Sequence, residues 1–129
     1  MKRGSLTRKQ VVVGICLVVA GLHFVIGPRY RGPWPAFVGG YLMDVLLPFS
    51  LYLLLGVSWR RVAGSRLTRG IVVFAIGAGV ELLQFLGVPL FGATFDVLDF
   101  VMYALGVVGA VVFERAVIAR LGASARRDA

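Results

Sequence analysis

The stretch GVELLQFLGVPLFGATFDVLDFVMY, residues 79–103, decides how this chain folds. It contains two apolar runs separated by a turn at Pro89, so it predicts a helical hairpin. It also holds Glu81, Asp96 and Asp99, three of the six acidic residues of the whole chain. Because a carboxylate in a membrane-spanning segment is energetically expensive, such residues mark a candidate functional site.

The composition of the chain indicates an integral membrane protein. Of its 129 residues, 59% are hydrophobic and 16% are charged, and the mean hydropathy is +0.89. Soluble domains are roughly 45–50% apolar and about 25% charged. The net charge of +8 comes from basic residues that flank apolar runs, a pattern that orients helices in a bilayer and contacts anionic lipid. No nucleic-acid-binding motif accompanies this charge, so we expect no nucleic acid as a partner.

The apolar runs predict an all-α bundle of four transmembrane helices that forms a single membrane domain over residues 1–129. We place the spans at about 11–27, 37–57, 70–87 and 95–118, followed by a flexible basic tail at 119–129. The first run could also be a signal peptide, with Val18 and Ala20 fitting a small-residue cleavage rule. We favour an uncleaved helix, because the run continues past that position and further spans follow.

The distribution of basic residues predicts the orientation of the chain. Twelve of the 14 lysines and arginines lie in the amino-terminal segment, the second loop and the tail. The other two, Arg29 and Arg31, lie in the first loop, and the third loop has none. Because basic residues concentrate on the cytoplasmic side of a membrane, we expect both termini and the second loop to be cytoplasmic. The first and third loops would then face outward from a bacterial inner membrane.

This orientation places Asp44, Glu81, Asp96 and Asp99, the four acids that we associate with the pocket, in the outer half of the bundle. It leaves the inner half nearly free of ionisable groups. Glu81 and Gln84 are three residues apart and share a helix face. The candidates for a ligand or ion pocket are Asp44, Glu81, Gln84, Asp96, Asp99, Tyr103, Arg29 and Arg31.

The helix faces also predict how these groups meet. A helical stripe on the fourth span consists of Asp99, Tyr103, Gly106 and Ala110. Gly77 lies on the same side of the third span as Glu81. Because small residues let helices approach closely in a membrane, we expect Glu81 to lie near Asp99 or Tyr103.

Simpler structural roles remain open for several of these residues. Asp96 and Asp99 suit the first turn of a helix, where they could act only as caps. Arg29 and Arg31 could be interfacial anchors, could pair with the acids, or could bind an anionic group.

No recognised catalytic signature is present, since the chain lacks GxSxG, HExxH, a phosphate-binding loop and CxxC. We therefore assign no catalytic residue, no cofactor and no dedicated metal site, and we favour a protein that is not an enzyme. Clustered carboxylates suit protons or a hard cation. Pro48 cannot donate the backbone hydrogen bond that the carbonyl of Asp44 would accept, so Asp44 could offer a second oxygen to a cation.

These observations predict a bilayer protein with an outward-facing acidic pocket that binds a polar ligand, a cation or a lipid head group. One alternative is a proton- or cation-coupled transporter, which would need to form a homo-oligomer because four short helices rarely enclose a pathway. Another is an enzyme acting on a lipid-linked substrate, with Glu81 and Asp99 as acid and base. A purely structural subunit is the fourth reading.

Several motifs resemble the VanZ-like family of small polytopic bacterial membrane proteins. They are RYRGPWPAFVGGYLMDVL, VELLQF and TFDVLDFVMYALGVVGA. The likeness covers residues 29–110 and includes an acid in the second span, an E-x-x-Q pair and a T-x-D-x-x-D-x-x-x-Y-x-x-G segment. It implies a multi-pass envelope protein. The residues that carry the resemblance are Asp44, Glu81, Gln84, Thr94, Asp96, Asp99, Tyr103 and Gly106.

Overall fold

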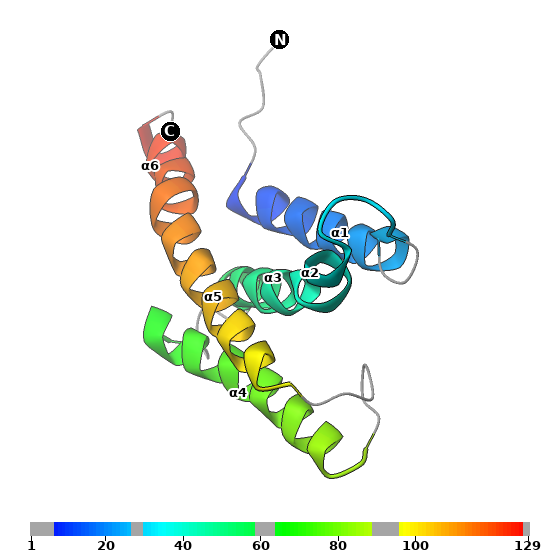
Figure 1. Cartoon of the computed structure of the whole chain (residues 1–129). Coiled ribbons are helices and arrows are strands. Elements are labelled where there is room, and N and C mark those ends of the chain that lie inside the picture. Colours follow the sequence, from blue (N-terminus) through cyan, green and yellow to red (C-terminus); the bar gives the residue numbers. More distant parts are fainter. Residues whose placement is uncertain (1–6, 27–29, 59–63, 89–95, 128–129) are drawn as a thin grey trace.

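The computed structural model describes residues 7–26, 30–58, 64–88 and 96–127, and within these ranges every regular element is helical (Figure 1). The elements are α1 (Arg8–Ile26), α2 (Pro35–Gly40), α3 (Leu42–Ser58), α4 (Arg66–Phe85), α5 (Val97–Phe113), the π-helical turn η1 (Glu114–Ile118) and α6 (Ala119–Arg127). The predicted all-α class is confirmed.

Three segments are long and apolar enough to cross a membrane, namely α1, α4 and the continuous segment Val97–Leu121. Helix α3 is also apolar but has only 17 residues. Large apolar side chains remain exposed on these helices, for example Phe24 at 83% and Leu17 at 68%. Because extensive apolar surface of this kind is unusual in a soluble monomer, it fits helices that are surrounded by lipid.

The helix boundaries differ from the expected spans at two places. The second expected span is divided at Tyr41 into the short helix α2 and the longer helix α3. Two consecutive glycines end α2, and glycine is a poor residue for continuing a helix. The segment expected to be a flexible tail is instead helical as far as Arg127, in direct continuation of α5 and η1. Alanine and arginine, which dominate its sequence, favour helix formation.

Helix α3 is the central element of the bundle. Figure 1 shows it between α1 and α4, with α5 crossing it and continuing through η1 into α6. Contacts of Asp44 with Asp99 and of Tyr52 with Glu114 show that α3 and α5 run parallel. Helix α4 runs the opposite way, because its start contacts Glu114 and its end contacts Tyr103. This alternation is what a chain requires if it crosses one layer repeatedly.

Helices α3 and α5 cross in close contact at Gly106. A Cβ atom at this position would overlap the carbonyl oxygen of Val45 and would come within 2.8 Å of the Pro48 ring. Only glycine allows the two backbones to approach this closely. The crossing buries the stripe of α5 that the sequence predicted, which consists of Asp99, Tyr103, Gly106 and Ala110.

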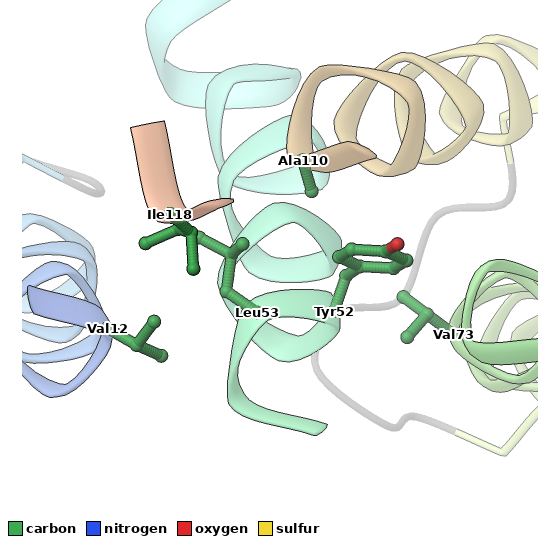
Figure 2. Packing of buried hydrophobic residues seen from close by; sticks show 6 residues of the cluster. All are labelled: Val12, Tyr52, Leu53, Val73, Ala110 and Ile118. Atoms are coloured by element: carbon green, nitrogen blue, oxygen red, sulfur yellow. The ribbon is translucent and has the colours of Figure 1, made fainter. Parts of the chain in front are cut away.

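A small apolar core lies between this crossing and the far end of α3. Its buried members are Val12, Tyr52, Leu53, Val73, Ala110 and Ile118 (Figure 2). They come from α1, α3, α4, α5 and η1, so each long helix contributes only one or two residues. Polar contacts at the helix ends therefore contribute strongly to holding the helices in their relative positions.

We predict that Gly106→Ala destabilises the protein by about 1–3 kcal/mol, because the added methyl group would force α3 and α5 apart. Gly109→Ala is the matched control, since a Cβ there would lie 3.8 Å from the Phe49 ring, an ordinary contact distance. Thermal unfolding of both purified variants in detergent measures the difference. Equal midpoints for the two variants would show that the crossing is not close-packed.

Candidate functional site

Four acidic residues from three helices form the carboxyl cluster, defined as Asp44, Glu81, Asp96 and Asp99. Asp44 of α3 and Asp99 of α5 share a side-chain hydrogen bond, and both interact electrostatically with Glu81 and Asp96. Two carboxyl groups can share a hydrogen bond only if one of them carries a proton. The sequence prediction that these acids converge agrees with this geometry.

Glu81 and Tyr103 join α4 to α5 within the same cluster. The Tyr103 hydroxyl donates a hydrogen bond of 3.0 Å to Oε1 of Glu81, which confirms the expected proximity of these residues. The Tyr103 ring occupies the space that a side chain at Gly77 would need. Glu81 is only 2% exposed, and its Oε2 atom has no hydrogen-bond partner among the residues that the structure describes. A buried carboxylate oxygen without a donor is energetically unfavourable, so this atom is suited to receive a proton or a cation.

Asp96 has the capping role that the sequence left open, and it also belongs to the cluster. Its Oδ1 atom accepts a hydrogen bond of 2.9 Å from the backbone N–H of Leu98, and its Oδ2 atom accepts one of 2.7 Å from the Tyr41 hydroxyl. Asp96 precedes the apolar segment Val97–Leu121. The Leu98 N–H and then the Tyr41 hydroxyl hold the pKa of the Asp96 carboxyl below its usual range. Asp96 is therefore stabilised in its ionised form.

The remaining predicted site residues are placed less centrally. Gln84 is half-buried one turn beyond Glu81 on α4. Arg31 is exposed, and within the described ranges it forms no ion pair with the carboxyl cluster. Arg29 and Thr94 lie outside the described residues. Tyr41 was not among the predicted residues, because a tyrosine at a helix start has no sequence signal that marks it as a hydrogen-bond donor.

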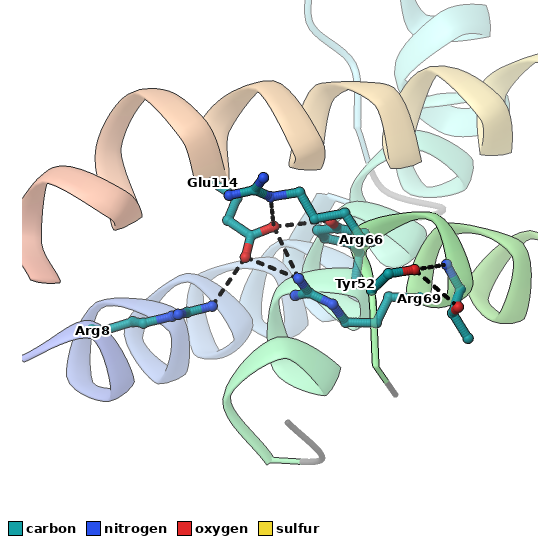
Figure 3. Close-up of polar contacts among 7 residues, drawn as sticks. Arg8, Tyr52, Arg66, Arg69 and Glu114 are labelled. Atoms are coloured by element: carbon teal, nitrogen blue, oxygen red, sulfur yellow. Dashed lines mark hydrogen bonds and ion pairs between the residues drawn. The ribbon is translucent and has the colours of Figure 1, made fainter. Parts of the chain in front are cut away.

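A second polar group, which we call the arginine cluster, consists of Arg8, Arg66, Arg69, Glu114 and Tyr52 (Figure 3). Glu114 is 5% exposed and accepts hydrogen bonds of 3.1 Å from Arg8 and Arg69 and of 2.9 Å from the Tyr52 hydroxyl. The Nε atom of Arg66 lies 3.6 Å from Glu114, and the Arg69 guanidinium lies 4.8 Å from the centre of the Tyr52 ring. One carboxylate thus ties α1, α3 and α4 to η1.

The arginine cluster corrects the expectation that one half of the bundle is nearly free of ionisable groups. Glu114 follows Asp99 by fifteen residues on one continuous rod, roughly 22 Å at the rise of an α-helix. The prediction missed this cluster because Arg69 was assigned to a loop and Glu114 was not considered as a partner for the basic flanks. The available signal was Glu114, the one acid inside an expected span at this end, close to the basic residues that flank the spans.

We predict that Glu114→Ala lowers stability by about 3–5 kcal/mol, because it leaves the buried Arg69 guanidinium without a carboxylate. Arg115→Ala is the control, since Arg115 is exposed and makes no ion pair with Glu114 among the described contacts. Its expected change is within about 0.5 kcal/mol. Denaturant unfolding in detergent micelles provides the comparison, and a Glu114→Ala variant as stable as the Arg115→Ala variant would contradict the structural role of the cluster.

Comparison with known proteins yields no relative. No family model, no curated protein and no solved structure matches this chain.

Proposed function

We propose that this chain is a small integral membrane protein of the bacterial cell envelope whose carboxyl cluster faces outward and binds a proton or a small cation. The observation that carries this proposal is the hydrogen-bonded pair of Asp44 and Asp99. Two carboxyl groups in contact within an apolar bundle need a positive charge between them, and a proton is the smallest one that satisfies them. The free Oε2 atom of Glu81 supplies a further acceptor nearby.

The same geometry narrows the class of ligand. A cluster with four carboxyl groups repels phosphate and carboxylate ligands, so an anionic lipid head group does not suit this site. Among the described residues Arg31 forms no ion pair with the carboxyl cluster, so this arginine does not neutralise it. A proton, or a cation that displaces it, is therefore the favoured occupant. The motif resemblance to the VanZ-like family is in keeping with an envelope location and stays a prediction.

A second candidate function is proton- or cation-coupled transport. Pro48 lies within α3 and cannot supply the N–H that the carbonyl of Asp44 would accept in a regular helix, so this carbonyl, beside the carboxyl pair, lacks its usual donor. Interrupted helices with this property hold coupling ions in transporters. Proton flux into vesicles that is lost on Asp99→Asn would favour transport, whereas proton binding without flux would favour a sensing or binding role.

We predict that the protein in nanodiscs shows the infrared carbonyl band of a protonated carboxyl group at neutral pH, and that Asp99→Asn or Asp44→Asn weakens it. Each substitution eliminates one half of the pair that shares the proton. Asp96→Asn is the matched control and leaves the band in place, because Asp96 is stabilised in its ionised form. A band that keeps its full intensity in both pair variants would refute the proposed proton site.

We also predict that a periplasm-active reporter fused after Gly92 is active, and that the same reporter fused after Arg60 is inactive. Gly92 lies in the third loop, which carries no basic residue, whereas Arg60 lies in the basic second loop. The reversed pattern would place the carboxyl cluster at the cytoplasmic surface and would overturn the outward-facing assignment.

A further inference from the structure

A cavity of about 680 Å³ lies beside the arginine cluster. It opens between the start of α1, the end of α3, the start of α4 and the turn η1. Its charged lining consists of Arg8, Arg66, Arg69, Arg115 and Glu114. Four guanidinium groups face one carboxylate, so the cavity has an excess of positive charge that Glu114 does not neutralise.

Arg69 provides a fixed and uncommitted donor in this lining. It is only 7% exposed, its Nη2 atom binds Glu114 at 3.1 Å, and its guanidinium packs over the ring of Tyr52. Its Nη1 atom is buried and has no hydrogen-bond partner in the part of the chain that the structure describes. A guanidinium that is already oriented needs little further ordering to bind an oxyanion, and its planar fork matches the oxygen spacing of phosphate.

Gly56 makes room for this donor. A side chain at Gly56 would overlap the Nη1 atom of Arg69, and both residues line the cavity. Ser65 caps the start of α4 by accepting a hydrogen bond of 3.2 Å from the N–H of Thr68, and it lines the cavity as well. The amino-terminal end of a helix carries partial positive charge, which adds to the attraction for an anion.

We propose that this cavity binds a phosphate group, carried either by an anionic phospholipid head group or by free phosphate. Glu114 and Tyr52 hold Arg69 in place, while the more exposed side chains of Arg66 and Arg115 close on the ligand. On the orientation predicted from the basic residues, this end of the bundle meets the cytoplasmic leaflet, which is rich in anionic lipid. The site is independent of the carboxyl cluster, so either assignment can fail alone.

The test compares binding of two phosphate sources to the full chain. Native mass spectrometry of the detergent-solubilised protein measures retention of phosphatidylglycerol against phosphatidylcholine, and titration calorimetry measures binding of inorganic phosphate. We expect the double variant Arg66→Gln/Arg115→Gln to lose affinity by about tenfold or more, since it removes two charge-assisted contacts to the phosphate. The control Arg120→Gln/Arg126→Gln removes the same charge from exposed positions outside the cavity and should change affinity less than about twofold.

A second pair of variants separates the shaped site from bulk charge. Gly56→Ala leaves the net charge unchanged but displaces the Arg69 guanidinium, so it should weaken binding by about tenfold. Gly79→Ala is its control, because no atom lies within 4 Å of a Cβ built there. Thermal unfolding of all four variants verifies that each remains folded.

Each outcome decides the proposal. Retention of phosphatidylglycerol without binding of inorganic phosphate assigns the site to a lipid head group, and competition between the two assigns it to phosphate itself. Equal losses in the two double variants, or an unchanged affinity in Gly56→Ala, would mean that only bulk positive charge attracts the anion and would overturn the proposal. A wild-type protein that retains phosphatidylglycerol no better than phosphatidylcholine and binds no inorganic phosphate would overturn the proposal as well.

Discussion

The contact of Gly106 with the backbone of α3 is the constraint on which the rest of the bundle depends. It brings α3 and α5 so close together that no side chain fits between the two backbones at this position. The two helices point in the same direction through this crossing. Asp44 therefore contacts Asp99 on one side of the crossing, and Tyr52 contacts Glu114 on the other. A single close approach thus positions both polar clusters, with the apolar core on the side of Glu114.

The two clusters satisfy their buried charges in opposite ways. Glu114 receives donors from Arg8, Arg69 and Tyr52, so its desolvation is offset by hydrogen bonds and opposite charge. In the carboxyl cluster like charges adjoin, and apart from the bond within the Asp44–Asp99 pair the described donors to them are two tyrosine hydroxyl groups and one backbone N–H. Such an arrangement is unfavourable unless a proton or cation completes it. A compensated cluster has a structural explanation, whereas an uncompensated one calls for a ligand.

The sequence predicted the features that depend on hydropathy and helix periodicity. The helical class, the buried stripe that includes Tyr103 and the contact of Tyr103 with Glu81 follow from spacing along single helices. The arginine cluster forms because particular helix ends lie together in the folded protein. A count of basic residues near the span ends considers each flank separately, so it could not predict this contact. Arg69 therefore looked like a loop residue, although tertiary packing buries it against Glu114. The division of the second span at Tyr41 was missed because hydropathy does not register the break that paired glycines introduce.

The π-helical turn explains how one rod serves both clusters. The buried positions of the rod are Asp99, Tyr103, Gly106, Ala110, Glu114 and Ile118. The spacing between successive buried residues alternates between four and three up to Ala110, which keeps them on one face of a straight α-helix. Beyond Ala110 each step is four residues. In an α-helix with 3.6 residues per turn, repeated steps of four would rotate the buried residues away from that face. The i→i+5 hydrogen bonding of η1 places more residues in each turn, so a four-residue step there no longer rotates past the buried face. Glu114 can therefore reach the arginines while Ile118 stays in the core, and neither the ion pairs nor the apolar packing has to yield to the other.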